Sequence, residues 1–213
     1  AARAQAGPSL EQGRRAVAEL RRGRIERPSS YDALTPEQKR YVDGILDGPR
    51  GNIPPPLAVM LASPGLGDLV QRGVAYARFS GREGYSSLPP KLNELAILMA
   101  ARMWTGEYVW NSHHAYAVKV GLSPEGVEAV RVGKRPACRE GDVKAVYSCL
   151  DEMLTTRRVS DATLRAARAA LGGDRGVVDL VGTFALYSIS SMMVMVDESP
   201  LPEGVAPHLP PLK

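Results

Sequence analysis

The sequence contains little cysteine, with Cys138 and Cys149 as the only two among its 213 residues. They do not form a CxxC motif, and the residues around them lack the spacing of a metal site. We therefore expect no disulfide framework and no bound metal, and the sequence is compatible with an oxidising compartment as well as a reducing one. Cys149 borders the apolar face of a helical pattern, where a cysteine usually serves as a small buried hydrophobe.

The body of the chain also lacks an excess of either charge. The formal net charge is +4, and the seven arginines and three glutamates of residues 1–30 account for all of it. Residues 31–213 are therefore formally neutral, and we expect no nucleic-acid-binding surface on them. We interpret residues 1–30 as a solvated, basic N-terminal arm, and the alternative is a contact with an acidic partner or a membrane surface.

The first residues lack the long apolar core of a signal sequence. Ala2-Arg3-Ala4 and Ala4-Gln5-Ala6 nevertheless have the small-x-small pattern of a signal-peptidase site. We expect a cytoplasmic protein, or a periplasmic one if residues 1–6 are the remnant of a removed export signal.

Period-two alternation with β-branched residues is absent as well, so the pattern does not favour β-strands. Apolar residues instead recur at helical spacing, and Ser, Thr and Pro mark the starts of several segments. The sequence predicts an all-α protein built mostly of helix pairs with short loops. The expected helices cover residues 9–27 and 176–196 and, between them, begin at Thr35, Ser63, Pro90, Gly106, Ser123, Asp142 and Ser160.

Residues 176–196 are apolar on nearly every side. Their length would suit a membrane span, but Asp179, Gly182, Thr183 and three serines argue against one. We predict instead a buried helix at the centre of the fold or at a subunit interface of a homo-oligomer. The helical domain is expected to cover residues 31–199, followed by a Pro-rich, extended tail over residues 200–213.

Residues 88–121 concentrate the groups that can do chemistry. The stretch holds two of the three His, both Trp, and the acids Glu94 and Glu107. Two prolines begin it, Gly121 ends it, and Thr105-Gly106 divides it into two helices. On the second helix, one face is shared by Tyr108, Trp110, His113 and His114.

The start of the second helix is suited to bind an anion. Free N–H groups at Gly106, next to Glu107, favour a negative charge such as a substrate carboxylate. We expect Tyr108, Trp110 and His114 to contribute to the same substrate site. The alternative for Tyr108 and Trp110 is core packing, and the alternative for Glu107 and His114 is solvent or a subunit contact.

His113 and Glu94 are the candidate catalytic residues. An imidazole held by a carboxylate on the neighbouring helix is suited to general acid–base chemistry. Decarboxylation next to a carbonyl-type electron sink needs a proton delivered to carbon and little else. Because the sequence offers no ligand cluster and no Gly-rich phosphate loop, we expect no metal and no organic cofactor. A satisfied structural Glu–His pair is the alternative.

Residues 88–130, LPPKLNELAILMAARMWTGEYVWNSHHAYAVKVGLSPEGVEAV, resemble the signature helix pair of the carboxymuconolactone decarboxylase family. That family also contains the alkylhydroperoxidase D-like proteins. The similarity continues over residues 142–196 and is absent from residues 1–30. The resemblance implies an all-α, alkylhydroperoxidase D-like helical bundle that assembles into trimers or hexamers.

The resemblance also distinguishes two branches of the family. In the peroxidase branch, a Glu precedes a CxxC motif, and a His follows the second Cys by four residues. Glu94 and His113 match that Glu and His, but Gly106 and Val109 replace the two cysteines, so thiol peroxidase chemistry is disfavoured. The sequence instead resembles the branch that includes the lactone decarboxylase of aromatic-acid degradation, through a W-T-x-x-Y-x-W-x-x-H motif made by Trp104, Thr105, Tyr108, Trp110 and His113.

Two functions follow from the sequence and the resemblance. The first is a carboxy-lyase-like enzyme that acts on a carboxylated lactone or keto-acid-like substrate through His113 and Glu94. The second is a non-catalytic helical oligomer that keeps the fold for a binding or structural role. A polar cavity around His113 would favour the enzyme, and a pocket filled by Trp110 and Tyr108 would favour the oligomer.

Overall fold

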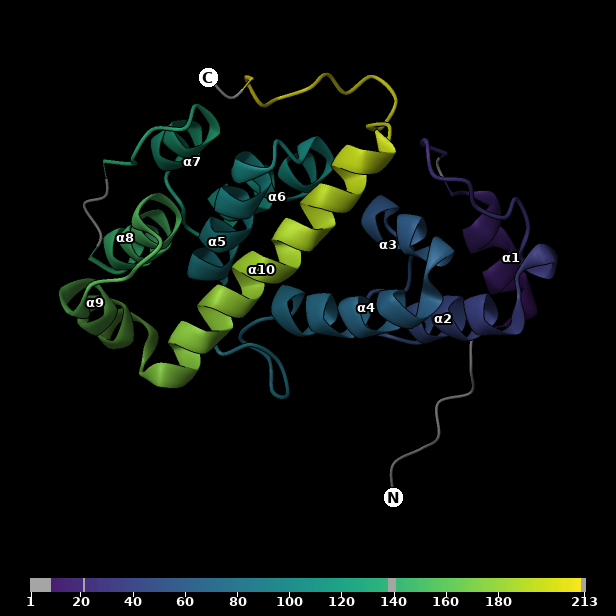
Figure 1. Ribbon diagram of the computed structural model, residues 1–213, viewed down its shortest axis with the longest axis horizontal. Helices are drawn as coiled ribbons and strands as arrows, with labels where there is room; N and C mark the ends of the chain where they lie inside the picture. The colour runs from purple at the N-terminus through teal and green to yellow at the C-terminus, as the bar shows by residue number, and fades with distance from the viewer. Residues whose placement is uncertain (1–8, 21, 138–140, 212–213) are drawn as a thin grey trace.

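The computed structural model describes residues 9–20, 22–137 and 141–211, and this part of the chain contains helices and no β-strand (Figure 1). The predicted all-α class is therefore confirmed. The elements in chain order are α1 (Leu10–Ala18), the 3₁₀ helix η1 (Tyr31–Ala33), α2 (Pro36–Leu46), α3 (Pro55–Val59), the 3₁₀ helix η2 (Met60–Ala62), α4 (Pro64–Arg78), α5 (Pro90–Met103), α6 (Glu107–Lys119), α7 (Pro124–Arg131), α8 (Gly141–Thr156), α9 (Asp161–Leu171) and α10 (Asp174–Asp197).

Short local signals determine where most helices begin. Thr35 caps α2, where its hydroxyl accepts from the Gln38 N–H while the Gln38 side chain accepts from the Thr35 N–H. Ser123 and Ser160 accept from the third residue of α7 and α9 in the same way. Ser63 precedes α4 as expected, but its side chain makes no capping hydrogen bond, so the helix begins through its first-position proline alone.

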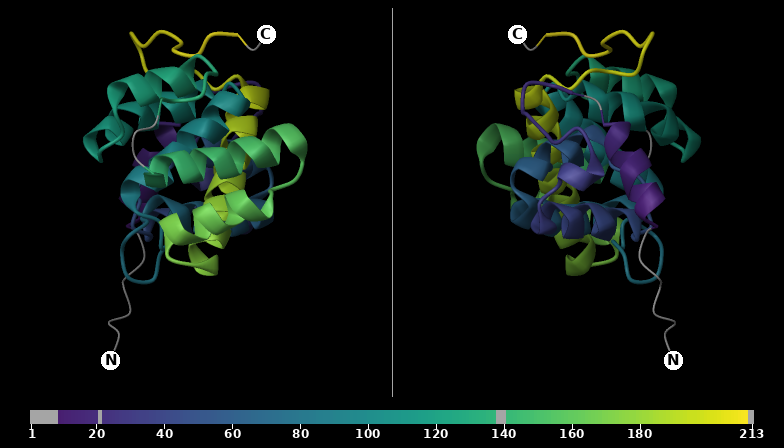
Figure 2. Two further views of the ribbon diagram at one scale, coloured as in Figure 1. Left: turned by 90° about the vertical axis from the view of Figure 1, so that its left-hand side faces the viewer. Right: turned by 90° about the vertical axis from the view of Figure 1, so that its right-hand side faces the viewer.

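Helix α10 connects two groups of helices. In Figure 1 it runs diagonally across the molecule, with α5 to α9 on one side and α1 to α4 on the other, and Figure 2 shows the same division from both ends. Its contacts reach α5, α6 and α9 in the first group and α3 and α4 in the second. The side chains that it buries between them are Leu180, Phe184, Tyr187 and Val194. Its central position in the fold agrees with the sequence pattern.

One apolar face of α10 remains open. Among the described residues, α10 is the one helix that is long and apolar enough to cross a membrane, and 44% of its most apolar segment is buried inside the chain. The open face follows helical spacing and includes Val178, Val181, Ala185 and Val196. The chain itself therefore covers one side of this helix and leaves an apolar stripe uncovered.

The C-terminal tail is extended, and it lies across the N-terminal end of α6. The Glu107 carboxylate accepts hydrogen bonds from the backbone N–H groups of His208 and Leu209, both at 2.8 Å. Arg131 donates to the His208 carbonyl at 2.6 Å, and Arg102 donates to the Pro210 carbonyl at 2.9 Å. Figure 1 shows the tail passing from α10 over α6 toward α7.

The basic N-terminal arm departs from expectation. Helix α1 ends at Ala18, so the helix predicted over residues 9–27 is about half as long as expected. The residues that follow run against the C-terminal end of α10, where Asp197 accepts from the Ile25 N–H at 2.8 Å and from Arg27 at 2.6 Å. A side chain at Gly23 would overlap Asp197, which explains the glycine there. The described part of the arm is thus bonded to the helical domain instead of being solvated.

We predict that Asp197→Asn lowers the free energy of unfolding by about 3–5 kcal/mol, the usual cost of breaking a buried ion pair from one side. The side chains of Arg27 and Asp197 are 2% and 0% exposed, so the remaining guanidinium loses the charge that neutralises it in a dry site. Urea denaturation followed by circular dichroism measures the change. Asp32→Asn is the matched control, because the Arg14–Asp32 pair is half exposed and should leave the denaturation midpoint nearly unchanged. Equal effects of the two substitutions would contradict the prediction.

Candidate active site

Helices α5 and α6 bring Glu94 and His113 together as the sequence predicted. The two helices are joined by a tight turn at Thr105, whose φ is 49°, and they pack against each other along their length. His113 Nδ1 lies 2.8 Å from Glu94 Oε2, and both side chains are buried. We expected the two side chains to be within hydrogen-bond reach, directly or through one water, and this is confirmed: the contact is direct, at a depth where a carboxylate needs such a partner.

The opposite edge of the His113 ring meets an arginine. His113 Nε2 lies 3.2 Å from Nη1 of Arg78, the last residue of α4. Because a guanidinium can only donate, Nε2 accepts this hydrogen bond and Nδ1 carries the proton that is donated to Glu94. The Tyr187 ring from α10 packs edge-on against the imidazole at 5.1 Å between centroids. The ring is thus held by three helices besides its own.

Two cavities meet at His113. The inner one, of about 100 Å³, is lined by Arg50, Tyr108 and Tyr187 among others, and the outer one, of about 300 Å³, by Arg82, Glu94 and Tyr116 among others. Three residues line both cavities and separate them: Arg78, Ser112 and His113. Among the residues that line either cavity, Glu94 is the only acid against three arginines, so the space around His113 favours an anion.

Burial sets the electrostatics of the inner cavity. It lowers the pKa of the Arg50 guanidinium, and the charge of Arg78 lowers it further. Arg50 Nη2 is shielded from solvent and has no hydrogen-bond partner among the described residues. Burial raises the pKa of the Tyr187 phenol, and the neighbouring Arg78 and Arg50 offset part of that rise. The cavity therefore combines an unsatisfied cation with a phenol that keeps its proton.

The structure brings only Tyr108, of the five predicted substrate-binding residues, to the cavity beside His113. Gly106 is buried against α10, where a Cβ would lie 2.6 Å from the Ser191 side chain, so it does not reach the cavity. Trp110 is 1% exposed and lies in the core, which was the alternative to a substrate-binding role. The expected anion site at Gly106 is thus occupied by the packing of the chain itself.

Glu107 and His114 lie on the side of α6 that faces the C-terminal tail. Glu107 is bonded to the tail backbone, and the His114 ring lies 4.8 Å from the ring of His208. His114 Nδ1 lies 3.1 Å from the Trp110 carbonyl of its own helix. These two residues therefore position the tail and not a ligand at His113.

Sequence reasoning missed three residues of the site: Arg50, Arg78 and Tyr187. Arg50 lies in the loop between α2 and α3, Arg78 ends α4, and Tyr187 lies within a helix that the pattern predicted to be buried. No local motif distinguishes them, because each comes to the cavity beside His113 from an element that is distant in the sequence. The Gly-Pro-Arg-Gly loop at residues 48–51 is the only local feature that could have drawn attention to Arg50.

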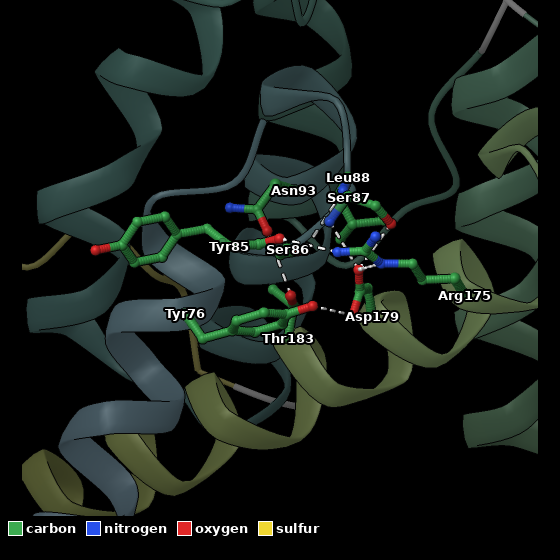
Figure 3. Close-up of polar contacts among 9 residues, drawn as sticks. All are labelled: Tyr76, Tyr85, Ser86, Ser87, Leu88, Asn93, Arg175, Asp179 and Thr183. Atoms are coloured by element: carbon green, nitrogen blue, oxygen red, sulfur yellow. Dashed lines mark hydrogen bonds and ion pairs between the residues drawn. The ribbon is translucent and has the colours of Figure 1, made fainter. Parts of the chain in front are cut away.

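A polar cluster on α10 positions the elements that carry this site. In Figure 3 the side chains of Tyr76, Ser87 and Arg175 converge on Asp179. Asp179 accepts from the Tyr76 hydroxyl at 2.9 Å and from both the N–H and the hydroxyl of Ser87 at 2.7 Å. Tyr76 lies two residues before Arg78, so the cluster ties the site end of α4 to α10. The hydroxyl of Thr183, on α10, likewise donates at 3.3 Å to Asn93, the neighbour of Glu94.

Cys149, the cysteine within the described residues, lies outside the site. Cys149 is buried on α8 and lines neither cavity, and burial raises the pKa of its thiol. Cys138 lies outside the described residues. Within the described residues, no group of three or more His, Cys, Asp or Glu side chains is placed to hold a metal ion.

The class of site is a buried acid–base pair that opens on a cationic cavity. Comparison with protein-family models and with curated proteins finds no match to this chain. The chain is therefore not assigned to the carboxymuconolactone decarboxylase family. The resemblance of residues 88–130 to that family supports a proposal about the reaction.

We predict that Asp179→Asn lowers stability at neutral pH and that its difference from the wild type shrinks as the pH falls below about 4. Burial raises the pKa of the Asp179 carboxyl, but the bonds from Ser87 and Tyr76 and the charge of Arg175 outweigh it, so the net shift is downward. A carboxyl whose pKa is lower in the folded state stabilises the fold above its unfolded pKa, and this contribution is lost as the pH falls through the folded pKa.

Urea unfolding at a series of pH values measures this difference. Glu83→Gln, an exposed substitution in the same loop as Ser87, is the control and should show no such dependence. A difference between wild type and Asp179→Asn that stays constant from neutral pH to pH values well below 4 would refute the prediction.

Proposed function

We propose that this chain is a cofactor-free enzyme in which His113 and Glu94 perform general acid–base chemistry on a small carboxylated molecule. The observation that carries the proposal is the buried Glu94–His113 hydrogen bond of 2.8 Å. The other edge of the same imidazole ring borders a cavity that is lined by arginines. The resemblance of residues 88–130 to the carboxymuconolactone decarboxylase family supplies the reaction class, the decarboxylation of a carboxylated lactone or keto-acid-like substrate. We likewise propose that the fold is an alkylhydroperoxidase D-like helical bundle and that the protein is cytoplasmic.

The geometry suggests how the proton moves. The carboxylate that leaves as carbon dioxide transfers its bonding electron pair to a carbon conjugated with a carbonyl group. His113, protonated at Nε2 from solvent, delivers that proton to the same carbon and returns to its neutral form. Glu94 stabilises the protonated ring and holds Nδ1, so that Nε2 is the ring nitrogen left for proton transfer once Arg78 no longer donates to it. The Tyr187 phenol, whose pKa burial raises, stays protonated and can donate to the carbonyl oxygen.

The open cavity beside His113 supports the enzyme over a non-catalytic oligomer. Trp110 lies in the core and Tyr108 forms part of the cavity wall, so neither side chain fills the space that a substrate would occupy. A structural Glu–His pair would need no cavity at its far edge and no second arginine there. The acid–base role is therefore the function that this geometry favours.

We expect His113→Asn to lower the rate of carbon dioxide release by at least about a hundredfold, the usual contribution of a general acid. Substrates are sought by screening the purified protein against carboxylated γ-lactones and keto acids. His208→Asn serves as the matched control, because this histidine lies on the tail, and it should keep wild-type turnover. Both variants should keep the wild-type circular dichroism spectrum. Full activity of His113→Asn on the substrate so found would disprove the acid–base role.

We also propose that the chain forms a homo-oligomer, a trimer or hexamer by the family resemblance, through the open face of α10. Val181 on that face and Val118 on α6 are both 39% exposed, which makes them a matched pair. Val181→Asp should shift the assembly toward smaller species in light scattering, because a charge is costly in an apolar interface, whereas Val118→Asp should not. A wild-type monomer at micromolar concentration would contradict the proposal, and a requirement for detergent would favour a membrane helix instead.

A further inference from the structure

The inner cavity holds a positive charge that nothing on its wall neutralises. Arg50 and Arg78 both line it, together with the hydroxyl-bearing Tyr108, Tyr187 and Ser190, and no acid is among its lining residues. Nη2 of Arg50 is buried without a hydrogen-bond partner in the described part of the chain. A guanidinium nitrogen that is shielded from water and has no hydrogen-bond partner is costly, so such a site stabilises an incoming anion.

The chemistry of these groups suits a carboxylate, which is the acidic group of the proposed substrate. The planar fork of an arginine matches the two oxygens of a carboxylate and forms paired, charge-assisted hydrogen bonds with it. Burial lowers the pKa of Arg50, and the charge of Arg78 lowers it further. An anion bound between the two arginines would offset the burial of Arg50 and its repulsion by Arg78. The Tyr108 and Tyr187 hydroxyls offer further donors on the same wall.

Arg78 occupies the position that the proposed chemistry needs. Its Nη1 lies 3.2 Å from His113 Nε2, so in this arrangement it covers the atom that would transfer a proton. It also stands between the inner cavity of about 100 Å³ and the outer cavity of about 300 Å³. The inner cavity alone is smaller than the roughly 300–1,000 Å³ of ordinary ligand sites, whereas the two joined would fall within that range. Arg78 is exposed at the end of its helix, which leaves its side chain room to move.

We propose that Arg50 and Arg78 form the receptor for a carboxylate of the substrate, and that Arg78 leaves His113 Nε2 when this carboxylate binds. The proposal rests on the acid–base role of His113. The carboxylate held here is one that the substrate retains, because two ion pairs to the departing carboxylate would stabilise the ground state and slow its loss. The substrate therefore carries a second acidic group, and its reacting carbon lies toward the outer cavity.

Calorimetric titration tests the receptor with defined probes. The probes are 5-oxotetrahydrofuran-2-carboxylate, 2-oxoglutarate and succinate, and the methyl ester of the first is the neutral comparison. We expect wild-type protein to bind at least one acid, and to bind the ester about tenfold more weakly than its acid or not at all. Arg50→Gln and Arg78→Gln should each weaken acid binding by about tenfold or more, the usual loss for a hydrogen bond to a charged group. Arg72→Gln, an exposed arginine of α4 paired with Asp68, should leave binding unchanged.

Nuclear magnetic resonance of the histidine rings tests the movement of Arg78. Binding of an acid should shift the ¹⁵Nε2 signal of His113, because its hydrogen bond from Arg78 is lost, and Arg78→Gln should show a shifted signal before any acid is added. Acid binding that is unaffected by Arg50→Gln, an absence of binding to all three acids, or an unmoved Nε2 signal would each overturn the proposal. Circular dichroism shows whether the variants are folded, and Arg50→Lys, which keeps the charge but not the fork, provides a second variant should Arg50→Gln unfold.

The His113→Asn variant separates this proposal from the proposed function. It should still bind the acids, because Arg50 and Arg78 remain in place, while losing turnover. If it keeps turnover while Arg50→Gln loses acid binding, the acid–base role is wrong and the receptor stands. If it loses turnover while Arg50→Gln binds acids normally, the receptor is wrong and the acid–base role stands.

Discussion

Two carboxylates of α10, Asp179 and Asp197, constrain the whole fold because each is too well buried to remain unpaired. A carboxylate removed from water must collect donors and cations to offset the lost hydration. Asp197 does so with Arg27 and the Ile25 N–H, which draws the N-terminal arm onto the end of α10. Asp179 does so with Tyr76 and Ser87, which draws in α4 and the loop before α5 (Figure 3). The two acids thus hold segments from distant parts of the chain against one helix.

The site inherits its geometry from this arrangement. Because α4 is tied to α10 through Tyr76, its last residue, Arg78, reaches the edge of the His113 ring. Because α5 is tied to α10 through Asn93, Glu94 is held at the opposite edge. The imidazole is therefore oriented by contacts that lie outside the catalytic pair, which is how a protein keeps a reacting group in position without strain.

Charge is distributed unevenly around that ring. Glu94 accepts a hydrogen bond from Nδ1 of His113 and lines the outer cavity but not the inner one. Arg50 and Arg78 face a shared space without a carboxylate of their own. A fold that only needed stability would give the buried Nη2 of Arg50 a hydrogen-bond partner, since a shielded polar group without one is costly. This imbalance agrees with a protein that receives its missing anion from outside.

The sequence by itself determined the features that depend on neighbours in the chain. It predicted the all-α class and most helix starts, because prolines and capping hydroxyls act within one turn. It also predicted the Glu94–His113 contact, because a short turn between consecutive helices brings the two helices side by side. Only the tertiary structure decided the partners of that pair. Arg78 and Arg50 come from separate elements, and the arm follows Asp197, which is 172 positions from Ile25. Such contacts form because buried charges require partners from other elements, and the local hydrophobic pattern does not indicate which elements supply them.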